Sequence, residues 1–286
     1  MDALAALRLQ IAWGADEALE EAPLDRLAAG ARPRPAQATA AATAARPALP
    51  APRPAAAPAI RAAGPPAHAT PAHATPVHAT PVHAAALRAQ AAADAAHTLA
   101  ELRAALAAFD GCPLAATATN LVFADGNPEA GLMLVGEGPG AEEDRAGRPF
   151  VGPSGQFLDR MLASIGLDRT QLLITNLIPW RPPGNRNPTD TEVLTCLPFL
   201  LRHIALVRPR RLVLLGALAT RALTGGVTGI TRMRGRWVEV TIPGLAAPVP
   251  ALPMLHPAYL LRSPGAKRLA WADLVALRRT LDADVK

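Results

Sequence analysis

Aromatic side chains are scarce in this chain. Phe, Trp and Tyr make up 3% of its 286 residues, and only one of them is a tyrosine. Half of the residues are hydrophobic, but many of these are alanine, which buries little surface and stabilises a core weakly. Each Phe and Trp therefore carries unusual weight, either in the core or in a binding site.

Cysteine is also rare, with Cys112 and Cys196 as the two examples. Two thiols do not make a disulfide-rich secreted scaffold. The sequence has no apolar run of membrane length, and its start lacks the pattern of a secretory signal peptide. We therefore expect a cytoplasmic protein that has no membrane partner.

Acidic residues are missing from one long stretch, between Arg26 and Ala93. Six arginines follow Arg26 within it, and they equal the formal net charge of +6. A sequence pI near 10.5 favours a nucleic-acid partner. Because the rest of the chain is close to neutral, however, a surface that faces DNA must be a local patch.

Composition divides the chain into three parts. Residues 1–27 form an amphipathic segment, which suits either a helix docked on the main domain or a peptide that binds an unknown protein. Residues 28–86 are rich in alanine and contain twelve of the thirty prolines. Proline prevents helix propagation, and this segment offers little large apolar surface to bury. We predict a disordered, semi-extended linker for residues 28–86.

Histidines recur in the linker with a period of five, within repeats such as AHATP at residues 67–71. A metal site needs ligands held in a fixed geometry. A plain linker is therefore favoured over a histidine metal site.

Residues 87–286 alternate between helical and strand patterns. This alternation predicts a three-layer α/β/α sandwich with a mostly parallel central sheet of about four strands. Asp190 is expected to cap the helix that it begins. The expected strands are 132–135, 171–176, 211–216, 237–242 and 251–255, and the expected helices are 87–109, 156–165, 190–207, 217–223 and 267–284.

Three of the predicted strands are followed by unusual loops. Gly136, Gly138 and Gly140 follow the first, in a loop that reaches Phe150 and lets backbone approach a ligand closely. Asn176 ends the second, and His256 follows the last. In a parallel sheet these ends lie along one edge, where open α/β sheets bind ligands. Alone, Asn176 or His256 is as well explained by a structural role, but the three loops together indicate a site.

The same loops resemble those of the uracil-DNA glycosylase superfamily, and most closely its family 4, the iron-sulfur type. The resemblance covers about residues 106–281. The motifs that carry it are GEGPG at 136–140, ED at 143–144, RPFVG at 148–152, RPPGNR at 181–186, HP at 256–257 and LLR at 260–262.

The resemblance implies an enzyme that flips uracil out of DNA and hydrolyses its N-glycosidic bond, as in base excision repair. It assigns stacking on the base to Phe150 and recognition of its Watson–Crick edge to Asn176, with Gly138 lining the base pocket. His256 would bind the developing anion at O2. Glu137 is the first choice for the carboxylate that assists the sugar and the water, and Glu143 or Asp144 is the second. The family match also associates Glu143 with excluding thymine.

Contacts to DNA are expected from the motifs at 181–186 and 260–262. Arginines there suit phosphates, and a leucine suits the gap left by a flipped base. The resemblance places these contacts at Arg181, Asn185, Arg186, Leu261 and Arg262, with Leu260 as the alternative wedge. We expect a monomer that turns over, because no histidine-bearing basic insertion of the covalently trapped branch is present.

The cysteines depart from the family-4 pattern, which has four cluster ligands. Cys112 and Cys196 match two of them, whereas Phe109 and Trp180 occupy the other two places. Because a four-iron cluster needs four ligands, we expect no cofactor and apolar packing in its place.

Two rival functions remain. Gly136, Gly138 and Ala141 match a relaxed dinucleotide-binding fingerprint, which needs a helix that starts at the glycines. Gly147 and Pro149 are expected to delay that helix, so the match looks accidental. The other rival is a catalytically weak DNA-binding module of the same fold, and the presence of all the candidate site side chains argues against it.

Overall fold

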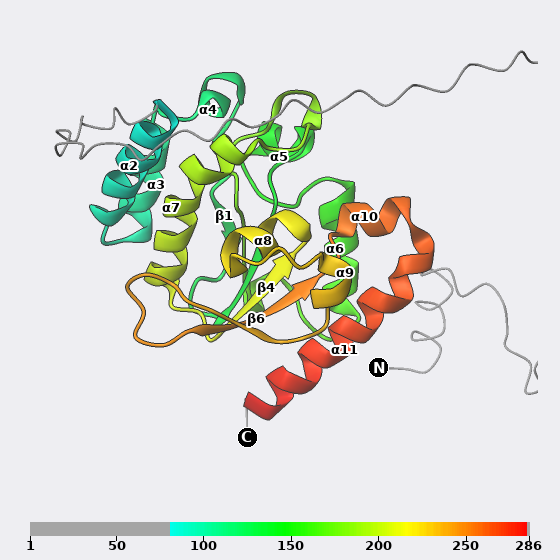
Figure 1. Ribbon diagram of the computed structural model, residues 1–286. Coiled ribbons are helices and arrows are strands. Elements are labelled where there is room, and N and C mark those ends of the chain that lie inside the picture. The colour runs from blue at the N-terminus through cyan, green and yellow to red at the C-terminus, as the bar shows by residue number, and fades with distance from the viewer. Residues whose placement is uncertain (1–80, 285–286) are drawn as a thin grey trace, which may run out of the picture. The chain divides into compact units, whose positions relative to one another are not determined.

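A computed structural model describes residues 81–284 (Figure 1). Residues 1–27, and the predicted linker as far as residue 80, lie outside this described part. The rest of the predicted linker, residues 81–86, belongs to helix α2 (Pro81–Asp94). The Pro71, Pro76 and Pro81 spacing does not continue beyond Pro81, and proline is well accommodated at the first position of a helix.

A six-stranded sheet forms the middle layer, in the order β1-β3-β2-β4-β6-β5. The four central strands are parallel, and the edge strands β1 and β5 pair antiparallel with β3 and β6. The predicted fold class is confirmed. The edge strand expected over residues 237–242 is present as β5, and β1 is a further short edge strand that was not predicted. The strands are β1 (Ala124–Gly126), β2 (Leu132–Gly136), β3 (Leu173–Asn176), β4 (Arg211–Leu215), β5 (Val238–Val240) and β6 (Val249–Met254).

Helices cover both faces of the sheet (Figure 1). Among residues 81–284, no helix is both long and apolar enough to cross a membrane. The remaining helices are α3 (Leu99–Ala108), α4 (Pro113–Thr117), α5 (Ala141–Ala146), α6 (Pro153–Ala163), α7 (Asp190–Val207), α8 (Ala217–Thr224), α9 (Ile230–Met233), α10 (Pro257–Arg262) and α11 (Lys267–Asp284), with short 3-10 turns η2 (Arg169–Gln171), η3 (Pro183–Asn185) and η4 (Pro264–Ala266).

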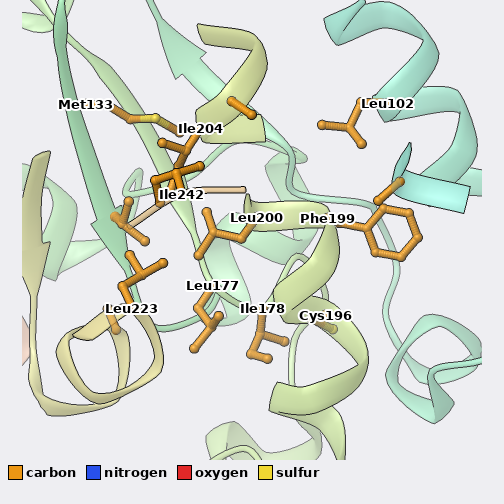
Figure 2. Packing of buried hydrophobic residues seen from close by; sticks show 14 of the residues in the cluster. Leu102, Met133, Leu177, Ile178, Cys196, Phe199, Leu200, Ile204, Leu223 and Ile242 are labelled. Atoms are coloured by element: carbon orange, nitrogen blue, oxygen red, sulfur yellow. The ribbon is translucent and has the colours of Figure 1, made fainter. Parts of the chain in front are cut away.

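Side-chain alternation along the strands divides the core in two. Met133 and Val135 of β2 face one cluster of buried residues, and Leu132 and Leu134 face the other. The first cluster contains α7 and the α2–α3 pair, and Figure 2 shows Leu200 on α7 on the side of the sheet. The second cluster contains α6, α10 and α11. The sheet is thus buried on both faces, as expected of parallel strands.

The single helix expected over residues 87–109 is wrong, because two helices, α2 and α3, occupy this stretch. Thr98 starts α3 by accepting a hydrogen bond from the backbone N–H of Glu101, and Glu101 accepts one from the N–H of His97. Such a pairing of Thr with Glu three residues later is a helix-start signal. The signal was present in the sequence as Thr98 and Glu101.

Two local predictions about helix starts also need correction. Thr189, and not Asp190, caps α7, because its hydroxyl accepts from Glu192 N–H while Glu192 accepts from Thr189 N–H. The helix expected to be delayed after the glycine loop begins at once, as the six-residue α5 after Gly140. A helix does start at the glycines, so the predicted delay, which spoke against dinucleotide binding, is wrong.

His203 of α7 is a buried histidine outside the strand-end loops. It is 2% exposed, and its ring stacks on Phe123 at 4.6 Å between centroids. Its Nε2 atom has no hydrogen-bond partner. Burial lowers the pKa of His203 to about 4, so this ring stays neutral at pH values where an exposed histidine is protonated.

Stability should therefore decline in mild acid because of His203. The unfolded chain takes up a proton near the ordinary pKa of 6.5, whereas the folded chain does so only near 4. Between these values we expect His203 to cost about 1.4 kcal/mol of unfolding free energy for each unit of pH lowered. Urea denaturation at several pH values should show a smaller decline for His203→Leu than for the parent.

The matched control is His97→Gln, because His97 is exposed. It should follow the parent's pH dependence. Equal slopes for His203→Leu and the parent would contradict the prediction.

Candidate functional site

The carboxyl ends of the four parallel strands open into one cavity of about 990 Å³. We call it the strand-end cavity. Glu137 after β2, Asn176 at the end of β3 and His256 after β6 all line it, together with Phe150. The predicted convergence of the three loops is confirmed. Parallel pairing explains it, since Gly136 lies opposite Asn176 and the two loops start level with each other.

Asn176 and Phe150 meet at Gly136. A Cβ atom on Gly136 would lie 2.4 Å from Asn176 Oδ1 and 2.5 Å from Phe150 Cζ, so only glycine fits there. Asn176 is 5% exposed, and its Oδ1 has no hydrogen-bond partner. A buried carbonyl oxygen without a partner is costly. It is free to accept a hydrogen bond from a ligand in the strand-end cavity.

Phe150 is held by its backbone. Its φ of 54° lies in the left-handed region, which is unfavourable for an aromatic residue. Arg169 of η2 donates to the carbonyl oxygens of Phe150 and, at 3.1 Å, of Pro149. The same guanidinium pairs with Asp125 at 2.6 Å and with Asp159 at 2.9 Å. Arg169 thus ties the loop that carries Phe150 to β1 and α6.

Glu137 lies against the start of α8. Its Oε1 accepts a hydrogen bond from Leu218 N–H at 3.2 Å. A Cβ on Gly216, where φ is 100°, would lie 2.4 Å from Glu137 Oε1 and 3.2 Å from His256 Cβ. Burial raises the pKa of Glu137, and the backbone N–H groups of α8 and the charge of Arg262 oppose that rise. The carboxyl group is thus a better proton acceptor than an exposed glutamate.

His256 presents one defined face to the cavity. Its Nδ1 accepts a hydrogen bond from Ala258 N–H at 3.2 Å, which places the proton of the neutral ring on Nε2. Burial, and then the charge of Arg262, lowers the pKa of His256 to about 4. The ring lies 5.7 Å from the Phe150 ring between centroids. His256 is therefore a neutral N–H donor beside an aromatic face.

Glu143 also lines the cavity, but its oxygens are engaged. Oε2 accepts from Gly140 N–H at 3.0 Å, and Oε1 accepts from Gly152 N–H at 2.8 Å. These contacts join the start of α5 to the loop before α6. The Glu143 carboxylate thus lies at the start of α5, where a dinucleotide would place its phosphates. Asp144 is engaged in the same way, because it accepts from Thr119 N–H.

Residues of α10 form part of the rim. Leu260 is fully buried in the core, whereas Leu261 is 40% exposed and lines the cavity. Of the two candidates for the wedge, Leu261 is therefore the one that is accessible to DNA. Arg262, expected from its motif, lines the cavity as well, and so does Tyr259, which none of the sequence motifs indicated. Gly138 also lines the cavity, and a Cβ there would meet nothing closer than Ile178 Cβ at 3.5 Å.

The loop after β3 supplies the opposite rim. Asn185 and Arg186 line the cavity, whereas Arg181 does not and instead donates to Asn185 Oδ1 at 2.7 Å. Arg186 forms two hydrogen bonds with Glu192, at 2.6 and 2.9 Å. The hydrogen bonds to Glu192 raise the pKa of Arg186. Both arginines of this loop are thus already engaged by neighbours.

The two cysteines lie together in the core, Cys196 on α7 and Cys112 directly before α4. Their Sγ atoms are 3.9 Å apart, and both thiols are free and buried. Phe109 packs edge-on against Phe199 at 5.1 Å between centroids, and Trp180 is buried in the same cluster. In residues 81–284, no group of three or more His, Cys, Asp or Glu side chains can hold a metal. This donor set does not fit a four-thiolate cluster.

Gly136 was identified from the sequence as a point of close backbone approach, but two other residues that support the site, Gly216 and Arg169, were not. Gly216 was visible as the end of a predicted strand, but its type does not reveal which side chains pass over it. Arg169 lies in a turn before β3, 19 residues from Phe150 in sequence. The completed cavity combines an aromatic face, a carboxamide, a neutral imidazole N–H and a carboxylate. This set suits a planar heterocycle with a polar edge.

Comparisons with known proteins agree with this geometry. The family model for the uracil DNA glycosylase superfamily matches residues 123–275. The type-4 uracil-DNA glycosylase of Pyrobaculum aerophilum is 38% identical over 169 residues, which are 58% of this chain and 85% of that protein. The type-4 enzyme of Archaeoglobus fulgidus is 42% identical over 157 residues, 54% of this chain and 78% of that protein. A type-5 uracil-DNA glycosylase of Pyrobaculum aerophilum is 33% identical over 174 residues, which are 56% of this chain and 74% of that protein.

The tautomer of His256 can be measured directly. We expect ¹⁵N NMR to show a neutral ring that carries its proton on Nε2 from pH 8 down to about 5, because its pKa is lowered to about 4. The His256→Gln variant identifies the signal by its absence. Protonation near pH 6.5, or a proton on Nδ1, would contradict this assignment.

Proposed function

This chain belongs to the uracil-DNA glycosylase superfamily, and we propose that it excises uracil from DNA within the strand-end cavity. It is a hydrolase of N-glycosidic bonds that acts in DNA repair and leaves an abasic site. The observation that carries this proposal is that Glu137, Phe150, Asn176 and His256, from three strand ends, line one cavity. A base within a duplex cannot reach such a cavity, so the nucleotide must be flipped out of the stack.

Recognition of the base falls to Asn176 and Phe150. In uracil, N3–H is a donor and O4 is an acceptor, so a carboxamide pairs with both. The free Oδ1 of Asn176 supports this role. Cytosine presents the opposite pattern at the same two positions, because its N3 is an acceptor and its C4 amino group is a donor. Phe150 offers a flat face on which the ring stacks.

Bond cleavage falls to His256 and Glu137. When the C1′–N1 bond breaks, its electron pair goes to the uracil ring and reaches O2, where the Nε2–H of His256 donates a hydrogen bond. The sugar becomes cationic and is stabilised by the Glu137 carboxylate. Water then adds at C1′ and its proton passes to Glu137, whose raised pKa suits a proton acceptor.

Glu143 has a supporting role in this proposal. Both of its oxygens already accept backbone N–H groups, of Gly140 and Gly152. It therefore shapes the cavity wall, and Glu137 is preferred as the reacting carboxylate. Because Glu143 already accepts the Gly140 N–H at the start of α5, this helix start does not favour nucleotide binding as an alternative function.

We propose further that the enzyme carries no iron-sulfur cluster and acts as a cytoplasmic monomer. The free buried thiols Cys112 and Cys196 support a reducing setting. Phe109 and Trp180 lie in the same buried cluster as the thiols, where the family pattern has the remaining ligands. The segment 1–27, as a site for a partner protein, remains a prediction from sequence.

A strand-scission assay tests the function. The protein is incubated with an oligonucleotide that carries one uracil and is then treated with alkali, which cleaves at abasic sites. Scission at the uracil position supports the proposal. Intact strands together with tight DNA binding would instead indicate a non-catalytic DNA-binding module.

Asn176→Asp should lower excision by about 100-fold, because a carboxylate cannot donate to O4 and repels it. Asn187→Asp, which adds the same charge at the exposed rim, is the matched control and should stay within a few-fold of the parent. Single-turnover rates on the uracil oligonucleotide measure both. Parent-like rates for Asn176→Asp would remove Asn176 from base recognition.

The pH profile should report Glu137. If its ionised form is required, kcat/KM falls as pH drops below its raised pKa, at a value above the ordinary 4.5. His256, with a pKa of about 4, titrates below this limb. Glu137→Gln should be roughly 10²- to 10⁴-fold slower and should lose the limb. A limb that persists in Glu137→Gln would assign it to another group.

Iron analysis tests the cofactor proposal. Anaerobically purified protein should contain no stoichiometric iron, because two of the four expected ligand positions are aromatic. Cys112→Ala/Cys196→Ala should retain the parent's excision rate. A brown absorbance band with about four irons for each chain would overturn the proposal.

A further inference from the structure

A second groove, of about 660 Å³, borders the strand-end cavity. We call it the arginine groove. Thr231 of α9 lines both the groove and the cavity, so the two adjoin at that residue. The remaining lining comes from α9, from the segment between α9 and β5, and from α11: Arg232, Arg234, Gly235, Arg236, Ala272 and Asp273.

Asp273 is the one acid that lines the groove, and Arg234 neutralises it. The guanidinium donates to Asp273 Oδ2 at 2.9 Å and to Oδ1 at 2.5 Å. It also donates to the carbonyl oxygen of Leu269. Asp273 is 2% exposed. An anion in the groove therefore meets no uncompensated negative charge, and Arg234 is fixed in place.

Arg232 and Arg236 flank this pair and are exposed. Within residues 81–284, neither forms an ion pair or a side-chain hydrogen bond. The groove therefore carries two free positive charges. By contrast, Arg181 and Arg186, in the loop after β3, are engaged by Asn185 and Glu192.

We propose that the arginine groove binds backbone phosphates of the DNA strand whose uracil enters the strand-end cavity. This inference rests on the proposed function. A flipped nucleotide stays joined to its neighbours, so the strand must cross the rim and leave over adjacent surface. The groove opens from that rim at Thr231 and offers free guanidinium groups, which suit phosphate oxygens.

The alternative is that Arg232 and Arg236 are ordinary solvated arginines. The two cases differ in how DNA affinity depends on salt. Each phosphate contact releases counterions, so losing two contacts from duplex DNA reduces the slope of log affinity against log salt by about 1.8. Two solvated arginines outside the interface would leave that slope almost unchanged.

The test compares Arg232→Gln/Arg236→Gln with a matched control in the full-length chain. The control is Arg103→Gln/Arg208→Gln: both arginines are exposed, Arg103 lies on α3, and Arg208 precedes the amino end of β4, away from the cavity. Fluorescence anisotropy with an undamaged duplex gives affinity at several salt concentrations. Steady-state excision on the same duplex with one uracil gives KM and kcat.

For Arg232→Gln/Arg236→Gln we expect affinity about tenfold or more weaker near 0.1 M salt, a slope smaller by about 1.8, and a raised KM with kcat within a few-fold of the parent. Arg232→Lys/Arg236→Lys should restore most of the slope, because it retains both charges. The control should behave as the parent.

Parent-like slope and KM in Arg232→Gln/Arg236→Gln would overturn the inference. The inference would also be overturned if Arg232→Gln/Arg236→Gln bound an RNA probe more weakly than the parent in the anisotropy assay but bound DNA as tightly. Failure of the proposed function is a separate result: the parent would then produce no scission at uracil, while anisotropy on undamaged DNA would still report on the groove.

Discussion

Parallel pairing of four adjacent strands is the constraint on which the site depends. Because β3, β2, β4 and β6 run in the same direction and lie side by side, their carboxyl ends form one row. Glu137, Asn176 and His256 are far apart in sequence, yet each is within one or two residues of the end of a strand in this row. Burial of the sheet on both faces holds the row rigid, because α7 packs on one side and α6 and α11 on the other.

Within this row, two glycines set how closely the functional groups approach. At Gly136 the missing side chain admits Asn176 and Phe150, and at Gly216 it admits Glu137 and His256. The same crowding buries the Asn176 carbonyl and much of the His256 ring, and this burial accounts for an unpaired oxygen and a lowered pKa in one cavity. The electrostatic character of the site thus follows from backbone that passes without Cβ atoms.

The sequence predicted the layered fold and the convergence of the strand-end loops, because apolar runs identify buried strands and parallel strands end together. It did not reveal which of two neighbouring leucines is buried, since that depends on how α10 rotates against α6; Leu260 is buried and Leu261 is exposed. Nor did it reveal that Glu143 would be engaged by Gly152, nine residues away. The split between α2 and α3 was readable from Thr98 and Glu101, but the alanine-rich pattern obscured it.

Arg169 extends the influence of the cavity beyond its lining. It joins the carbonyl oxygen of Phe150 to Asp125, a residue of the edge strand β1. Asp125 does not line the cavity, yet losing its carboxylate would remove one of the ion pairs that hold Arg169 against the Phe150 backbone. Substitutions of Asp125 would therefore lower activity as substitutions of residues that line the cavity do. The part of the protein that is sensitive to mutation thus extends to the edge strand of the sheet.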